Sequence, residues 1–487
     1  MKTLVIGLDG AVPELLFEDE RLENIRRLMD AGSYGRLESI VPPITVPAWM
    51  CMAASQDPGS LGVYGFRNRI DHSYQGLEFV NAKSIDALTL WDQMAREGKR
   101  SITVGVPPGY PPRKVNGISV GCFLTPDTSR DTFTHPAAFR LEIDALVGNY
   151  PVDVKGFRTH DKAWLRDQIL TMTRTHFKVV RHLMKNHDWD YFQLVEIGLD
   201  RIQHGFWKYH DPRHVLHEPD SPYSETIRDY YRLLDEEIGT LLELLTGDTN
   251  VLVLSDHGAQ RLDGGFCINE WLIREGLLVL NEYPSEVTPF AKLDVNWHKT
   301  KAWSEGGYYA RVFLNVRGRE PHGAIDPEDY ERFRDDLKGR LEATTDAEGM
   351  SIGTDVFKPE EIYRDVRNIA PDLIVHFGGL LWRSIGGVGY SDLHILENDT
   401  GPDDCNHAQF GAFILAGSHV PPSGQRDGAH LLDMAPTLLE LAGHDIPSSM
   451  QGRSFASAES VATSSTGYTP VEEEILRNRL SGLGYIA

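Results

Sequence analysis

The stretch Tyr191-Phe-Gln-Leu-Val-Glu-Ile197 is an apolar run that leads into Gly-Leu-Asp200-Arg-Ile-Gln-His204. Its length and composition are typical of a buried strand. If the chain turns helical at Asp200, the Asp200 carboxylate and the His204 imidazole stand four residues apart on one helix face. A carboxylate and an imidazole arranged in this way can bind one metal ion. The stretch therefore predicts a strand followed by a helix with a metal-binding face.

Other short apolar runs also carry polar residues at their ends. Residues 3–8 precede Asp9-Gly10, and residues 251–254 precede Ser-Asp256-His257-Gly. His407 stands just before the apolar run of residues 411–417. Open α/β sheets place their ligands at the carboxyl ends of parallel strands. We therefore expect Asp9, Asp256, His257 and His407 to lie close to Asp200 and His204.

Thr45 occupies the segment Val41-Pro-Pro-Ile-Thr45-Val-Pro47-Ala-Trp. The two leading prolines favour an extended approach, and Pro47 suits the first turn of a helix. Thr45 is therefore expected at a helix N-terminus, where developing negative charge is stabilised. Taken alone, the segment favours a simple N-cap. The metal-ligand candidates elsewhere favour a nucleophile instead.

The loop of residues 55–69 is rich in turn-forming residues and would lie near Thr45. Within it, Asn68 could donate a hydrogen bond to a phosphoryl oxygen. Arg67 or Arg69 could supply positive charge, although exposed surface arginines are the simpler interpretation.

The length and net charge of the chain limit the number of domains and the kinds of partner that it can have. The chain has 487 residues, which predicts one large α/β domain with insertions, or two domains. It carries 48 Lys and Arg against 71 Asp and Glu, a net charge of -23. Such a surface argues against general binding to nucleic acid or anionic membranes. An acidic enzyme can still bind a phosphate where metal ions reverse the local sign of charge.

Targeting and redox signals are weak. The N-terminal apolar segment is short and lacks a small-residue cleavage site, so it is interpreted as a strand. There is no run of 18 apolar residues, so no membrane insertion is expected. The four cysteines are widely spaced and fit neither a disulfide framework nor a zinc knuckle. A cytoplasmic protein is the default expectation.

The alternation of apolar runs with helical patterns predicts the domain organisation. Residues 1–275 form the first part of a catalytic α/β core, and residues 371–455 form its second part. Between them, residues 276–370 break the rhythm with frequent Pro, Gly and charged residues, and we interpret them as an inserted cap. Arg317 and Arg319 of this cap could reach a substrate. Residues 456–487 are expected to be a linker and a terminal helix.

The candidate ligands share nitrogen and oxygen donors without thiolate, a set that suits zinc or manganese. Two such ions about 3.5–4 Å apart can stabilise both the attacking and the leaving oxygen of a phosphoryl displacement. Thr45 would then attack phosphorus and form a covalent intermediate that water cleaves. The candidate ligands are Asp9, Thr45, Asp200, His204, Asp256, His257 and His407.

The same motifs, in this order, resemble the alkaline phosphatase superfamily in its type I phosphodiesterase/nucleotide pyrophosphatase branch. They are most similar to its predicted phosphohydrolase or phosphomutase group. The segments Asn315-Val-Arg-Gly-Arg-Glu-Pro and Asp433-Met-Ala-Pro-Thr-Leu-Leu-Glu-Leu also resemble that group. The resemblance implies a three-layer α/β/α fold with a mostly parallel central sheet and an inserted cap.

The resemblance also implies site roles. It assigns Asp200, His204 and His407 to one divalent metal, and Asp9, Thr45, Asp256 and His257 to the other. Zinc is the first expectation for both metals, and manganese is the alternative. Thr45 would be the nucleophile and Asn68 the group that holds the phosphoryl oxygen. The Phe-Arg-Asn-Arg context of Asn68 departs from the family pattern, and His430 competes with His407 for one ligand position.

Three functions follow from this resemblance. The leading one is a two-metal phosphoesterase with a phospho-threonine intermediate, acting on an organic phosphodiester or nucleotide-type small molecule. A phosphomutase would use the same phospho-enzyme but return the phosphate to a second hydroxyl. A degenerate protein that only binds a phosphorylated ligand is the third, although every expected ligand type is present.

Overall fold

The computed structural model describes residues 1–456. Its central feature is a ten-stranded sheet of order β20-β2-β19-β9-β1-β8-β5-β6-β7, with β21 paired beside β20 on β2. The strands β1, β5, β6, β8 and β9 run parallel, whereas β19 runs antiparallel to both β9 and β2. The strands span Lys2–Leu8 (β1), Gly32–Glu38 (β2), Ser101–Val104 (β5), Gly117–Val120 (β6), Thr134–His135 (β7), Tyr191–Glu196 (β8), Thr249–Leu254 (β9), Phe410–Ala416 (β19), Gly424–Gln425 (β20) and Ala429–His430 (β21).

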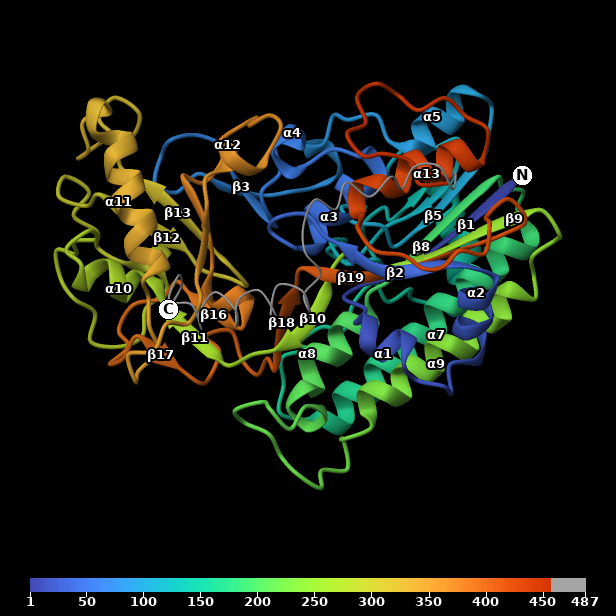
Figure 1. Ribbon diagram of the computed structural model, residues 1–487, viewed down its shortest axis with the longest axis horizontal. Coiled ribbons are helices and arrows are strands. Elements are labelled where there is room, and N and C mark those ends of the chain that lie inside the picture. The colour runs from blue at the N-terminus through green and yellow to red at the C-terminus, as the bar shows by residue number, and fades with distance from the viewer. Residues whose placement is uncertain (457–487) are drawn as a thin grey trace, which may run out of the picture.

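Helices cover both faces of this sheet, as Figure 1 shows. One layer contains α1 (Pro13–Phe17), α2 (Glu23–Ala31), α6 (Arg140–Val147), α7 (Lys162–Asn186), α8 (Gly198–His210) and α9 (Thr226–Leu242). The opposite layer contains α3 (Thr45–Ala54), α4 (Pro58–Leu61), α5 (Leu90–Arg96) and α13 (Met434–Leu441). The predicted three-layer α/β/α fold with a mostly parallel central sheet is therefore confirmed.

The strand sequence explains the two-sided core. In β1, Leu4 and Ile6 pack against the α7–α8–α9 layer, whereas Val5 packs against the α3 layer. Successive side chains of a strand point to opposite faces, so a strand buried on both sides is apolar at most of its positions. The continuous apolar runs seen in the sequence are the consequence.

A second, smaller lobe lies beside the central sheet, to the left in Figure 1. Its sheet has the order β12-β13-β15-β14, and a three-stranded sheet β16-β11-β17 packs on the same apolar core. The elements between the sheets and around them are β3 (Arg67–Arg69), β4 (Leu77–Phe79), β10 (Gly258–Arg261), β11 (Gly264–Cys267), α10 (Ile268–Arg274), β12 (Ala302–Glu305), β13 (Ala310–Leu314), α11 (Tyr330–Glu342), β14 (Asp355–Phe357), α12 (Pro359–Ile362), β15 (Leu373–His376), β16 (Trp382–Ile385), β17 (His394–Ile395) and β18 (Cys405–Ala408).

This lobe is wider than the predicted insertion at 276–370. It already includes β11 at residues 264–267, and it still includes β15 at residues 373–376, which pairs with β13 and β14. The central sheet resumes only at β19. An apolar run identifies a buried strand but not the sheet that accepts it. The linker and terminal helix expected at 456–487 lie, from residue 457 onward, outside the described residues.

The helix that carries Asp200 and His204 starts at a tightly packed glycine. A Cβ on Gly198 would overlap the Tyr230 hydroxyl and the Glu196 carboxylate, and would lie 2.8 Å from Thr173 Oγ1. All three groups are buried and hydrogen-bonded to one another. The turn from β8 into α8 therefore requires glycine at this position.

We expect Gly198→Ala to lower the free energy of unfolding by about 1–3 kcal/mol through overpacking. Urea denaturation would measure the change. Gly339→Ala is the matched control, because no atom lies within 4 Å of its added Cβ in α11. The control should raise the stability by about 0.5–1 kcal/mol. Equal effects of the two substitutions would contradict the packing argument.

Candidate active site

The candidate site lies where three neighbouring parallel strands end. β1 is paired with β8 on one side and β9 on the other, with Leu8 opposite Glu196 and Gly7 opposite Leu254. Asp9 follows β1, Asp256 follows β9 by one residue, and α8 begins two residues after β8. Because the strand ends are in register, the side chains that follow them converge. Helix α8 presents Asp200 and His204 on one face, as the spacing predicted.

His407 reaches the same place by a different route. It belongs to β18, which pairs antiparallel with β10, and the pairing sets His407 opposite Ala259. The imidazole of His407 stacks on that of His257, with ring centroids 3.8 Å apart. The chain thus crosses the whole smaller lobe before it returns a ligand to the site.

Each of the three carboxylates has one oxygen bonded to the scaffold. Asp9 Oδ2 accepts a hydrogen bond from Trp49 Nε1 at 2.9 Å, and Asp256 Oδ1 accepts one from the Gly10 amide at 3.3 Å. Asp200 Oδ2 accepts from Arg201 Nη1 at 2.5 Å. The other oxygens of Asp9 and Asp256 are buried and accept no hydrogen bond from residues 1–456. They face the site.

Each of the three histidines likewise has one ring nitrogen bonded to the scaffold. The Nδ1 atom of His257 lies 2.9 Å from the Gly258 carbonyl oxygen, and that of His407 lies 2.8 Å from the Pro43 carbonyl oxygen. The Nδ1 atom of His204 lies 2.6 Å from Asp403 Oδ1. Carbonyl and carboxylate oxygens only accept, so each Nδ1 is the donor. Each Nε2 atom therefore faces the site, with its lone pair available whenever the ring is neutral. This is the arrangement that metal-binding histidines require.

The inward-facing atoms form two overlapping groups. Asp9, Asp256 and His257 make one group, and Asp200, His257 and His407 make the other, each with ligand atoms within 4.8 Å of one another. His204 Nε2 lies 3.2 Å from Asp200 Oδ1, which adds this histidine to the second group. Buried oxygen and nitrogen atoms without protein partners fit divalent cations well. The structure thus brings together all six predicted carboxylate and imidazole ligands.

The pKa shifts of these buried groups also fit a site for cations. Burial, together with the Asp200 charge, raises the pKa of Asp9 well above its ordinary value, and burial together with the Asp9 charge does the same for Asp256. Burial lowers the pKa of His257 to about 4, which keeps its imidazole neutral. Burial disfavours a charged His204, but the surrounding negative groups, Asp403 first and Asp200 among them, together outweigh it and raise that pKa well above its ordinary value. Cations at this site would replace those protons.

Thr45 is the first residue of α3 and is buried. Its Oγ1 lies 3.2 Å from His257 Nε2 and forms no cap of its helix. The same helix places Trp49 one turn later, where its indole bonds Asp9. One helix therefore fixes both the hydroxyl and a carboxylate of the site.

Two residues that the sequence did not single out hold the ligands in place. Arg201 donates to Asp200 and forms a bidentate ion pair with Asp153, at 2.9 and 2.8 Å. Asp403 holds the His204 ring and also accepts from Arg158 at 2.9 Å. Asp403 lies only four residues before His407, and this proximity is the signal that could have found it.

A cavity of about 300 Å³ opens onto Thr45, Asp200 and His407. Arg67 lines it, whereas Asn68 does not. The Asn68 side chain instead bonds its own loop, accepting from the Tyr64 amide and donating to the Gly62 carbonyl oxygen at 2.6 Å. The sequence prediction for Asn68 rested on its position in the chain alone. A sequence motif does not reveal the hydrogen bonds that a side chain makes within its own loop.

Other sequence candidates also lie elsewhere. Arg319 is paired with Asp372 and Arg317 with Asp326, so both arginines serve the smaller lobe. His430 Nδ1 accepts a hydrogen bond from the Leu432 amide and caps a short helix. His407 rather than His430 therefore lies at the site.

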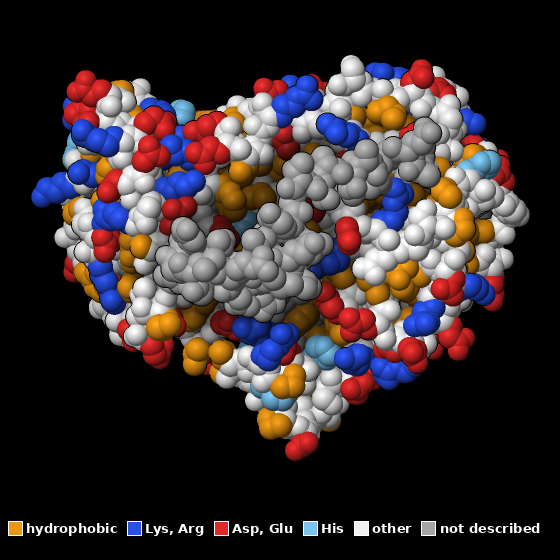
Figure 2. Space-filling model, in the orientation of Figure 1, with side chains coloured by type: hydrophobic (Ala, Val, Ile, Leu, Met, Phe, Trp, Pro, Cys, Tyr) orange, Lys and Arg blue, Asp and Glu red, His pale blue; other side chains and the backbone are white. Residues whose placement is uncertain are grey.

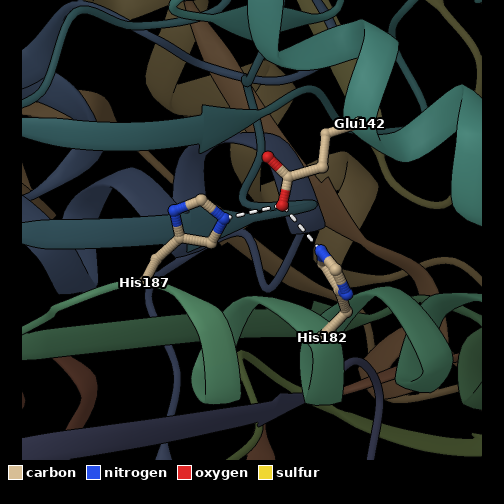
Figure 3. A group of neighbouring side chains, drawn as sticks. All are labelled: Glu142, His182 and His187. Atoms are coloured by element: carbon tan, nitrogen blue, oxygen red, sulfur yellow. Dashed lines mark hydrogen bonds and ion pairs between the residues drawn. The ribbon is translucent and has the colours of Figure 1, made fainter.

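A separate cluster of Glu142, His182 and His187 joins α6 to the end of α7 (Figure 3). Both Nε2 atoms lie close to the same oxygen, Glu142 Oε1, at 2.6 and 2.7 Å. The three side chains are half-buried and complete one another as hydrogen-bond partners. Its members contact none of the ligands described above, so we keep the cluster apart from the active site.

The fold and this group of buried carboxylates and imidazoles fit a phosphoric ester hydrolase, and the family match agrees. Residues 3–403 match the family model described as type I phosphodiesterase / nucleotide pyrophosphatase. The chain belongs to this family. No curated protein matches its sequence.

Solved structures share the fold at low sequence identity. Murine ectonucleotide pyrophosphatase/phosphodiesterase 5 has 14% identity and a TM-score of 0.52, with 92% of this chain and 96% of that chain covered. Phosphonoacetate hydrolase from Sinorhizobium meliloti has 16% identity and a TM-score of 0.57, with 89% and 94% covered. Within residues 1–456 there is no helix with the length and hydropathy to cross a bilayer.

The raised carboxyl pKa values predict how the metal-free protein responds to pH. A carboxyl group whose pKa is raised on folding binds its proton more tightly when folded, so it destabilises the fold as pH rises above 3.8. We expect the chelator-treated wild type to lose stability relative to Asp256→Asn between about pH 4 and the raised pKa.

Urea denaturation of both proteins across that range would measure this. Reloading with zinc should reverse the order, because the variant lacks a ligand oxygen. Parallel stability profiles for the two metal-free proteins would contradict the electrostatic argument.

Asp403 should act on metal binding through His204. We expect Asp403→Asn to lower metal affinity about 10–100-fold, as loss of a carboxylate behind a ligating histidine does. Competition with a fluorescent chelator would measure the affinity. Asp404→Asn is the matched control, because Asp404 is an equally buried neighbour whose side chain has no bond to the His204 ring. Equal losses in the two variants would assign the effect to folding.

Proposed function

We propose that this protein is a two-metal phosphoesterase that cleaves an organic phosphodiester or nucleotide-type substrate through a phospho-threonine intermediate. One observation carries the proposal. Three carboxylates and three imidazoles each have one polar atom bonded to the scaffold and the other directed inward, beside the hydroxyl of Thr45.

The ligands divide between two divalent cations. Asp200, His204 and His407 would hold one, and Asp9, Asp256, His257 and the Thr45 oxygen would hold the other. His257 lies near members of both groups, which fits two neighbouring sites. The donor set suits zinc first and manganese second. When bound, such ions lower the pKa of a nearby hydroxyl and neutralise charge on the phosphoryl oxygens.

The residues of the chain then perform two displacements. Thr45 Oγ1 loses its proton and attacks phosphorus, so an O–P bond to Thr45 forms and the bond to the leaving group breaks. The leaving oxygen takes up a proton as it departs. Water next attacks the phospho-threonine, which releases the remaining phosphate ester and restores the Thr45 hydroxyl. The N-terminus of α3 favours the negative charge that develops at Thr45.

Several observations support a small phosphoester as the substrate. The cavity of about 300 Å³ has the size of a small-molecule site. An inactive variant of the murine structural neighbour was solved in complex with AMP. Family membership supports phosphodiester or pyrophosphate cleavage.

We expect Thr45→Ala to lower kcat for bis-p-nitrophenyl phosphate by more than about 10³-fold, as loss of a catalytic nucleophile does. Thr45→Ser is the matched control, because it keeps a hydroxyl at the same place and should keep part of the activity. Release of p-nitrophenol and metal content by mass spectrometry would be measured together.

The outcomes separate the alternatives. Two bound metals with Thr45-dependent release of p-nitrophenol would establish the phosphodiesterase. Transfer of the phosphoryl group to an added alcohol without release to water would favour a phosphomutase. Undiminished hydrolysis by Thr45→Ala would show that Thr45 is not the nucleophile.

A further inference from the structure

The walls of the cavity above Thr45 contain five arginines and one carboxylate, Asp200. The arginines are Arg67, Arg158, Arg201, Arg311 and Arg383. This concentration contrasts with the chain as a whole, which has a net charge of -23. On the face seen in Figure 2, acidic and basic side chains are interspersed over both lobes.

Three of these arginines have carboxylate partners at close range. Arg201 is paired with Asp153 and Asp200, and Arg67 lies 2.9 Å from Glu305. Arg158 lies 2.9 Å from Asp403. Their charges are therefore largely balanced by the protein itself.

Arg311 differs from these three. It is only 7% exposed, and within residues 1–456 no carboxylate lies within 4.0 Å of its guanidinium. Its one side-chain hydrogen bond goes from Nη1 to the Arg67 carbonyl oxygen. Among the described residues the other N–H groups of Arg311 have no hydrogen-bond partner, and Arg311 lines the cavity.

Arg383 is the second incompletely paired cation. It is 6% exposed, and its buried Nε has no hydrogen-bond partner in the described part of the chain. Its nearest carboxylate contacts, to Asp403 and Asp399, are long at 3.5 and 3.7 Å. The guanidinium lies over the Tyr308 ring, 4.9 Å from its centroid. Tyr308 also lines the cavity and stacks on His407.

A buried charge without a counter-ion is costly, so proteins rarely keep one unless a ligand completes it. Among the described residues Arg311 is such a group, whereas Arg383 has only long contacts to Asp403 and Asp399. Both guanidinium groups line a cavity that opens onto the nucleophile. Guanidinium groups recognise phosphate and carboxylate through paired N–H donors. The cavity is thus built to receive an anionic group in addition to the phosphoryl group at Thr45.

We propose that the substrate carries a second anionic group, a carboxylate or a further phosphate, which Arg311 and Arg383 bind. The proposal rests on the proposed function for the place of the reacting phosphoryl group. The volume of about 300 Å³ is at the small end of ligand sites and favours a compact molecule. The substrate class is therefore a small phosphoester with two anionic groups rather than a neutral lipid or sugar ester.

A matched pair of ligands isolates the second charge. The acid 3-phosphonopropionate and its carboxamide have nearly the same shape and differ by one negative charge. Calorimetry with the metal-loaded wild type should show the acid binding at least about tenfold more tightly than the amide, because one buried charge-assisted contact is worth that much. This readout needs no turnover.

Variants of Arg311 test whether this residue causes the preference for the acid over the amide. Arg311→Gln should bring the ratio of the two dissociation constants close to one, whereas Arg311→Lys should keep part of it. Arg319→Gln is the control, because Arg319 lies in the same lobe but is paired with Asp372 and does not line the cavity. Its ratio should equal that of the wild type.

Equal binding of acid and amide by the wild type would overturn the proposal. An acid preference that persists in Arg311→Gln would also overturn the assigned role of Arg311. If the wild type prefers the acid but hydrolyses no phosphodiester, the anion site stands and the proposed function fails. The two hypotheses are therefore tested separately.

Discussion

The architecture of this protein depends on one electrostatic constraint. Asp9, Asp200 and Asp256 lie buried together at the carboxyl end of the central sheet. Like charges in a low-dielectric interior repel strongly, and the burial that brings them together also removes the water that would screen them. Only protons, arginine or bound cations can balance such a cluster. The surrounding scaffold is arranged so that the inner oxygens remain available to cations.

The scaffold achieves this by bonding the outer polar atom of each ligand. An indole, a backbone amide and a guanidinium hold the carboxylates, and two carbonyl oxygens and Asp403 hold the imidazoles. These bonds fix both the orientation of each side chain and the tautomer of each neutral ring. A site prepared in this way loses little freedom when a ligand arrives. Its precision derives from rigid elements, since α3, α8 and the strand ends carry most of the groups.

The amino-acid sequence predicts this centre better than it predicts the surroundings. Asp9, Asp200 and Asp256 follow apolar strands, and strand ends of a parallel sheet meet at one edge, so their proximity follows from pattern alone. The roles of Asn68, Arg311 and Arg383 do not follow from pattern. They depend on which loop closes on itself and on how the smaller lobe packs over the cavity. The boundaries of the smaller lobe do not follow from pattern either, because the apolar run of β15 could pair in either sheet.

The position of β19 has a consequence for biosynthesis. This strand lies between β9 and β2 and closes the sheet, and it follows directly on the strand that carries His407. Until about residue 416 has left the ribosome, β9 and β2 have open edges and no ligand can arrive from β18. The emerging chain therefore cannot bring all six of these carboxylates and imidazoles together before nearly the entire core has been translated.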